Sequence, residues 1–276
     1  MKIGVVGPFT GSRSAYGKLL RRAISRASQG VENINWIVCD DRADPIQSKN
    51  AAEYLIKQGV TAVIGHFNSE CALLVAGLYE SAQIPFLAPA STHPDLTSLG
   101  KEFVFRICPT DTQQIDRVSR FIKRHDLTQT LVVSDGSFYG NSLASRLDFP
   151  KSSSYQAVFF CGSHINSSKC LSEYRRQGFS GAFIASDDSK IEDFIRLANG
   201  NTENTYVLGF RETYEEACFF GAKILATLLG RYPNIRHHEL SNLIRQDHFS
   251  ENGERLGTQW SVWEINLGQF VELQNA

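Results

Sequence analysis

Short apolar runs alternate with longer amphipathic segments along this sequence, and that alternation constrains the fold more than any other feature. Lys2–Gly7 has the continuous apolar character of a buried strand, whereas Tyr16–Ser28 carries its apolar residues on one helical face. Strands that alternate with helices predict a parallel sheet with right-handed crossovers. Later strands are predicted at Asn35–Asp40, Thr61–Gly65, Pro85–Ala88, Phe103–Ile107, Thr130–Ser134, Ala157–Phe160, Ala182–Ala185 and Thr205–Gly209.

The pattern restarts once, so the residues predict an α/β protein with two Rossmann-like lobes, about 1–108 and 109–210. A C-terminal segment packs back, and Trp260–Ile265 and Gln269–Leu273 read as a terminal hairpin around Gly268. One helix start is marked clearly, because Asp44 precedes Pro45 and Gln47 follows in capping-box register.

Charge and hydropathy exclude two classes of partner. With 28 Lys+Arg and 29 Asp+Glu the net charge is −1, which gives no electrostatic drive toward nucleic acid. Apolar runs are a few residues long, far below the roughly 18 that a membrane span needs, so no membrane insertion is expected.

Localisation and redox state follow from two further features. The first strand begins directly behind Met1, so we expect a cytoplasmic protein if Met1 is the native start and a periplasmic one if a signal peptide was removed. Six scattered cysteines without close-pair spacing favour reduced thiols over a disulfide framework.

Small polar loops follow the strands, at the edge where parallel sheets bind ligands. Hydroxyls and free N–H groups at helix starts suit a carboxylate, although each such residue could equally be a simple helix cap. Tyr16 and Tyr139, each directly before a glycine, are candidates to cover a small molecule. The loops are Gly7–Gly11, Gly65–Ser69, Pro89–His93, Asp135–Gly140 and Ser186–Asp188.

Enzyme motifs are weak throughout. The segment Gly11–Lys18 has one residue too many for a phosphate loop, and Leu19 stands where Mg²⁺ would need a hydroxyl. No Gly-x-Ser-x-Gly motif is present. Cys161, His164 and Cys170 offer only three zinc ligands in a polar loop region. A catalytic set drawn from His66, His93 and Asp40 or Asp41 lacks a nucleophile. We therefore expect no catalytic residue, no metal and no cofactor.

The loops together resemble the type I periplasmic binding proteins of the branched-chain amino-acid class. The resemblance is nearly continuous over residues 1–140 and thinner over 141–210. The matching segments are Ile3–Gly11, Ala15–Gly17, Asp40–Asp41, Asp44–Pro45, Val63–His66 with Ser69, Pro85–Thr97, Phe105–Arg106 and Tyr139–Gly140.

This resemblance implies a two-lobed clamp that closes on an amino acid by hinge motion. The first lobe would comprise residues 1–108 and about 212–257, and the second 109–211 and about 258–276. Ser69, Ser91 and Thr92 would grip the α-carboxylate and α-ammonium, and Tyr16 and Tyr139 would cover the ligand.

The chain departs from the family in its second lobe. Asp187 stands where an aromatic residue is common and would meet the ammonium. Arg211 stands at an acidic position and would meet an anionic group on the ligand or lie on the surface, unless the alignment slips to Glu212. The cysteines of a family disulfide are replaced by Ala43 and Asn68. A strand and a helix are missing between Gly209 and Tyr214, which would leave a sheet edge exposed or covered by a partner.

These observations lead to a non-enzymatic solute-binding component of an ABC-type amino-acid transporter, with a small-molecule ligand and a membrane permease as partners. The alternatives are a cytoplasmic amide or amino-acid sensor that regulates a partner protein, an α/β enzyme, and a ligand-free interaction module.

Overall fold

The computed structural model describes residues 1–98, 100–147 and 154–274. The chain divides into two compact units, which we call lobe 1 (Met1–Thr110 and Glu212–Thr258) and lobe 2 (Asp111–Arg211 and Gln259–Ala276). Each lobe is an α/β unit around its own sheet, so the predicted fold class is confirmed. Among the described residues, no helix combines the length and apolar character needed to cross a membrane.

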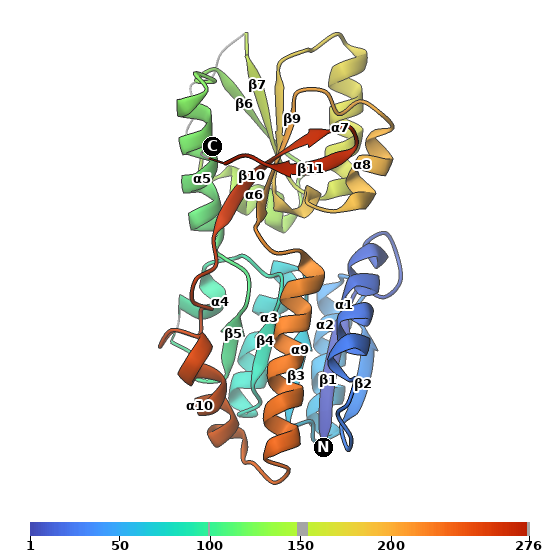
Figure 1. The fold of residues 1–276 in the computed structure, drawn as a ribbon, viewed down its shortest axis with the longest axis vertical. Helices are drawn as coiled ribbons and strands as arrows, with labels where there is room; N and C mark the ends of the chain where they lie inside the picture. The colour runs from blue at the N-terminus through green and yellow to red at the C-terminus, as the bar shows by residue number, and fades with distance from the viewer. Residues whose placement is uncertain (99, 148–153, 275–276) are drawn as a thin grey trace. The chain divides into compact units, whose positions relative to one another are not determined.

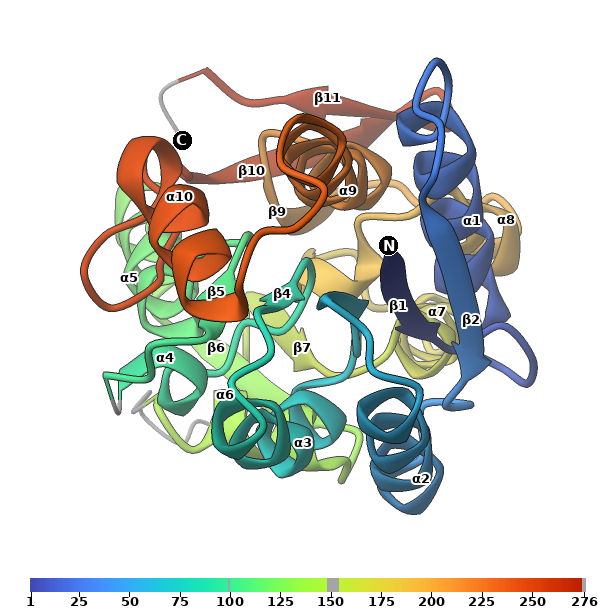
Figure 2. The same ribbon diagram turned by 90° about the horizontal axis from the view of Figure 1, so that it is seen from below.

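Lobe 1 is built on a wholly parallel five-stranded sheet in the order β2-β1-β3-β4-β5. Helices α1 and α9 cover one face, and α2 and α3 cover the other (Figures 1 and 2). The elements are β1 (Lys2–Gly7), α1 (Ser14–Ala27), β2 (Asn35–Asp40), α2 (Pro45–Lys57), β3 (Ala62–Gly65), α3 (Ser69–Ser81), β4 (Phe86–Ala88), α4 (Asp95–Ser98), β5 (Val104–Arg106), α9 (Tyr214–Arg231) and α10 (His237–His248).

Local sequence explains where these helices start. Asp44 accepts a hydrogen bond from the Gln47 N–H (2.8 Å) and Pro45 opens α2, which confirms the predicted start. Helix α9 begins with a full capping box, in which Thr213 and Glu216 bond each other's backbone N–H. Sequence reading had not assigned that second cap.

Lobe 2 has a six-stranded sheet in the order β11-β10-β9-β8-β7-β6. Strands β6 to β9 are parallel, and β10 and β11 are added antiparallel. The elements are α5 (Asp111–Arg124), β6 (Thr130–Ser134), α6 (Phe138–Ala144), β7 (Ala157–Cys161), α7 (His164–Arg176), β8 (Ala182–Ala185), the 3₁₀ turn η1 (Asp187–Ser189), α8 (Glu192–Ala198), β9 (Thr205–Phe210), β10 (Trp260–Asn266) and β11 (Gln269–Glu272).

The terminal hairpin closes the sheet edge at which the sequence reading expected exposure or a partner. Strand β10 pairs with β9 from Trp260 opposite Phe210 to Glu264 opposite Tyr206, and β11 then becomes the edge strand (Figure 1). Lys190 reinforces the hairpin, with its ammonium 3.6 Å from the Trp263 ring centroid and 4.7 Å from that of Phe270. The chain's own C-terminal segment therefore covers the edge of β9.

Candidate functional site

Three predicted ligand residues lie on neighbouring strands of lobe 1. Ser69 is the first residue of α3, after β3, and Ser91 and Thr92 follow β4. Strands β3 and β4 are paired and parallel, so their carboxyl ends share one edge of the sheet. All three side chains are buried, and within the described chain the Ser91 hydroxyl has no hydrogen-bond partner. Hydroxyl donors beside the N-terminus of α3 can bind a carboxylate.

Asp40 holds the loop that follows β1 at the same edge. Its carboxylate accepts hydrogen bonds from the backbone N–H groups of Phe9 (2.8 Å), Thr10 (3.3 Å) and Arg42 (3.1 Å), and from the Thr10 hydroxyl. Partial burial raises the pKa of Asp40, but these hydrogen bonds outweigh burial and lower the pKa below its ordinary value. A carboxylate that stays ionised fixes this loop.

Arg106 holds the loop that follows β4. Its side chain is completely buried at the end of β5. The guanidinium donates to the His93 carbonyl (2.7 Å) and the Thr97 hydroxyl (2.7 Å), and it pairs with Glu254. Because His93 directly follows Thr92, this network sets the conformation of the segment that carries Ser91 and Thr92.

Tyr16 lies inside lobe 1. Its ring is 5.7 Å from that of Phe67 and 5.3 Å from that of Tyr214, and only 2 % of its surface is exposed. The structure thus brings Tyr16 to the turn that follows β3. Tyr214, which packs edge-on against Tyr16, had not been singled out from the sequence.

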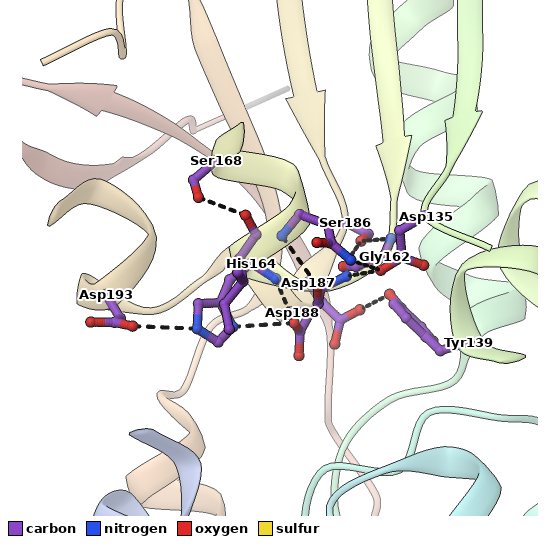
Figure 3. Close-up of polar contacts among 12 residues, drawn as sticks. Asp135, Tyr139, Gly162, His164, Ser168, Ser186, Asp187, Asp188 and Asp193 are labelled. Carbon is purple, nitrogen blue, oxygen red and sulfur yellow. Dashed lines mark hydrogen bonds and ion pairs between the residues drawn. The ribbon is translucent and has the colours of Figure 1, made fainter. Parts of the chain in front are cut away.

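Two predicted ligand residues of lobe 2 contact each other. The Tyr139 hydroxyl donates to Asp187 (Figure 3). The Gln114 side-chain amide donates to the same carboxylate oxygen (2.8 Å). Desolvation and the negative charges of Asp187 and Asp111 raise the pKa of Tyr139 well above its ordinary value. Tyr139 therefore stays a protonated donor, and Asp187 is held by α5 and α6.

His164 lies between two further carboxylates in lobe 2. Its backbone N–H donates to Asp188 (2.7 Å), its Nδ1 is 3.4 Å from Asp188 Oδ2, and its Nε2 is 3.4 Å from Asp193 Oδ2 (Figure 3). These contacts tie α7, η1 and α8 together. Both ring nitrogens of His164, which is one of the three candidate zinc ligands in the sequence, therefore face carboxylates. In the described ranges, no three His, Cys, Asp or Glu side chains form a metal-binding group.

Asp135 follows β6, and its carboxylate, like that of Asp40 in lobe 1, accepts hydrogen bonds from backbone N–H groups of nearby loops. It accepts hydrogen bonds from the N–H groups of Ser137 (3.0 Å) and Ser163 (2.8 Å) and from the Asn166 amide (3.2 Å). Burial raises the pKa of Asp135, but the hydrogen bonds of Ser137, Ser163 and Asn166 bring the pKa below its ordinary value. From the sequence only the loop that holds Asp135 and Ser137 was expected, because Ser163 and Asn166 come from distant positions.

This lowered pKa predicts a pH dependence. A carboxyl whose pKa is depressed in the folded state stabilises the protein above the unfolded-state pKa of about 4, and that stabilisation is lost as the pH falls through the folded-state value. We expect Asp135→Asn to flatten the decrease in the free energy of unfolding between about pH 5 and pH 2, measured by urea unfolding. Asp116→Asn, at an exposed position of α5, is the control, and equal slopes for the two variants would contradict the expectation.

Arg211 contacts the terminal hairpin. Its side chain is two thirds exposed, and its Nε is 3.0 Å from Glu272 on β11. Glu212, the alternative position, accepts a hydrogen bond from Arg255 Nη1 (2.7 Å). The hairpin therefore supplies the partner of Arg211.

Comparison with known proteins gives one matching family model, described as periplasmic binding protein, over residues 1–148. An amino acid binding protein of Pseudomonas aeruginosa is 27% identical over 253 residues, covering 77% of this chain and 66% of that protein. A Leu/Ile/Val-binding protein homolog of Brucella abortus is 24% identical, covering 74% and 65%. The chain thus spans just under two thirds of the length of these curated relatives.

Solved structures share the fold. A leucine binding protein from Thermotoga maritima has a TM-score of 0.89 at 20% identity, covering 99% of this chain and 98% of that one. A branched-chain amino acid transporter substrate binding protein from Streptococcus pneumoniae, in complex with isoleucine, has a TM-score of 0.85 at 16% identity, with 99% of both chains covered.

Proposed function

This chain belongs to the periplasmic binding protein family, and from that premise we propose that it is a non-enzymatic protein that binds an amino acid or a closely related small molecule. We further propose that it acts as the solute-binding component of an ABC-type transporter, with a membrane permease as its partner. The names of its relatives, which are amino-acid-binding and transporter proteins, support both statements.

One observation carries the proposal. The hydroxyls of Ser69, Ser91 and Thr92 are buried at the shared carboxyl edge of β3 and β4, and the Ser91 hydroxyl lacks a hydrogen-bond partner among the described residues. A buried hydroxyl without a partner costs free energy, and a ligand carboxylate would supply the missing acceptor. We assign the α-carboxylate to this edge of lobe 1.

The ammonium group is assigned to lobe 2. Asp187 is an almost fully buried carboxylate, and Tyr139 and Gln114 orient it through hydrogen bonds. A buried carboxylate favours a cationic partner. For Arg211, contact with an anionic group of the ligand requires that it exchange Glu272 for that group.

Ligand screening tests the proposal. We expect at least one of the twenty amino acids or their amides to raise the melting temperature, because ligand at 100 times Kd stabilises the native state by about 2.7 kcal/mol. Ser69→Ala and Thr92→Ala should each weaken binding roughly 10-fold or more, the worth of a hydrogen bond to a charged group. The measurement is differential scanning fluorimetry followed by titration calorimetry.

The matched control is Ser81→Ala, which removes a hydroxyl from the far end of the same helix, where it bonds the Gly77 carbonyl. Asp187→Asn adds a chemical control: it should weaken binding of the amino acid but not of the corresponding acid without the amino group. If no member of the panel stabilises the wild-type protein, the proposed function is wrong.

A further inference from the structure

Three side chains form a buried polar chain in lobe 1. Asp41, His66 and Tyr79 each expose 1 % of their surface or less. Asp41 Oδ2 lies 3.3 Å from His66 Nδ1, and His66 Nε2 lies 3.1 Å from the Tyr79 hydroxyl. Across the described residues, neither Asp41 Oδ2 nor His66 Nδ1 has a hydrogen-bond partner, so each depends on its contact with the other. Burial without such pairing would be costly.

The pair bridges the end of strand β1. Asp41 directly follows β2 and His66 directly follows β3, and these two strands flank β1 in the sheet. The Asp41 N–H donates to the Gly7 carbonyl (3.1 Å), and the His66 N–H donates to the Val6 carbonyl (3.0 Å). The carboxylate–imidazole contact therefore joins two loops across the edge that carries the proposed carboxylate site.

Both loops contain non-glycine residues in the left-handed backbone conformation. His66 has φ +51°, and Arg42 and Ala43 have φ +51° and +58°. Left-handed conformations at such residues are retained only when their surroundings enforce them. Asp41 Oδ1 accepts the Ala43 N–H (3.0 Å), so one carboxylate stabilises the first loop with one oxygen and contacts His66 with the other.

The partners also define the proton arrangement. Burial raises the pKa of Tyr79 well above its ordinary value, and the electrostatic interactions with Cys39 and Asp41 add to this effect, so the phenol stays protonated. A carboxylate oxygen accepts, and Asp41 Oδ2 lies beside His66 Nδ1, so we place the proton on Nδ1 and leave Nε2 to accept from the Tyr79 hydroxyl. In this arrangement the Tyr79 hydroxyl donates to His66 Nε2, and the proton on His66 Nδ1 faces the Asp41 carboxylate.

His66 and Tyr79 bracket Ser69 along the sequence. Tyr79 is on α3 itself, so its contact with His66 holds the helix against the turn from which it starts. The next residue, Phe67, packs against Tyr16. A displaced His66 would thus move the Ser69 hydroxyl and the Tyr16 ring together.

We propose that His66 is a positioning residue, which with Asp41 and Tyr79 locks the loops after β2 and β3 so that Ser69 is pre-oriented for its ligand. This inference rests on the proposed function for its ligand, but the locking of the loops is independent of any ligand.

The test uses variants of the whole chain that break one contact at a time. Tyr79→Phe removes only the hydroxyl. His66→Gln keeps an acceptor, its amide oxygen, near the position of Nε2 and loses the contact with Asp41. His66→Asn can reproduce the Nδ1–H and tolerates a left-handed backbone. Ser241→Ala is the control, because it deletes a buried hydroxyl that bonds the Glu102 carbonyl (2.6 Å) beyond the amino end of β5.

The first readouts need no ligand. We expect the ¹⁵N spectrum of His66 to show a protonated Nδ1 and an unprotonated Nε2. Amide hydrogen exchange at positions 43 and 66 should be at least tenfold faster in His66→Gln than in Ser241→Ala, compared at conditions where the two variants have lost the same amount of melting temperature. The exchange rate in His66→Asn should lie between those two. Tyr79→Phe should accelerate exchange at His66 even where the other variants fold poorly. Unchanged exchange in the two loops, or a proton on Nε2, would overturn the inference.

The second readout is the affinity for whichever amino acid stabilises the wild-type protein. We expect Kd to rise at least tenfold in His66→Gln and to remain unchanged in Ser241→Ala. Equal affinities would show that the polar chain of Asp41, His66 and Tyr79 stabilises lobe 1 without orienting Ser69, and would overturn the positioning role of His66. If no amino acid binds, the proposed function fails while the exchange data still decide whether the loops are locked.

Discussion

Replacing Arg106 by methionine should destabilise lobe 1 by about 3 kcal/mol or more, because breaking a buried ion pair typically costs about 3–5 kcal/mol. We take the lower end of that range because Glu254, the partner of Arg106, is partly exposed. The change leaves the His93 carbonyl and the Thr97 hydroxyl without their donor. For a unit of this size the melting temperature should fall by about 6–12 °C. Ligand affinity should fall as well, since Ser91 and Thr92 lie directly before His93.

Arg176→Met is the matched control. Arg176 also pairs with a carboxylate, Glu173, but its side chain is three quarters exposed, and such surface pairs contribute little to stability. Scanning calorimetry measures both variants. A loss for Arg106→Met no larger than that for Arg176→Met would contradict the role assigned to this network.

The fold could be predicted from the sequence because it depends on local patterns. All nine predicted strands up to Thr205–Gly209 are present, since continuous apolar runs bounded by polar loops mark buried parallel strands. Crossover rules then place Ser69, Ser91 and Thr92 at one end of the sheet without any knowledge of distant contacts.

Partners of the lobe 2 residues could not be predicted in the same way. Asp187 is held by Gln114, which is 73 positions away, and Arg211 is paired with Glu272, which is 61 positions away. Periodicity carries no information on such pairs. The hairpin itself was visible in the sequence, but not that it would pair antiparallel with β9 and thus bring Glu272 to Arg211.

The buried chain of Asp41, His66 and Tyr79 shows another limit. From the sequence, His66 and Asp41 were candidates for a catalytic set that lacked a nucleophile. They were also parts of the segments that match the family, and neither was assigned a supporting role. The structure places both side chains below the surface, where they stabilise loops. Burial is a tertiary property, and the residue types alone did not reveal it.

Gly65→Ala should be among the most damaging single substitutions in the chain. Gly65 ends β3 with φ +145°, and a Cβ there would lie 1.9 Å from the Val6 carbonyl oxygen. No side-chain rotation relieves this overlap, since the Val6 oxygen is a backbone atom, the backbone fixes the position of the Cβ, and the two strands are paired. Strain and overpacking together predict a loss of about 3 kcal/mol or more, and loss of ligand binding, because Gly65 directly precedes His66 in the turn that leads to Ser69.

Gly77→Ala provides the opposite expectation on the helix that follows. Gly77 is exposed in the middle of α3, and a Cβ there would meet no atom within 4 Å. Alanine is the better helix former by about 1 kcal/mol, so this variant should be more stable than the wild type and should bind ligand unchanged. Urea unfolding and titration calorimetry on the two variants separate a general intolerance to alanine from a requirement for glycine at the end of β3. If Gly65→Ala were as stable as Gly77→Ala, the close approach of β3 to β1 could not be what shapes the turn before Ser69.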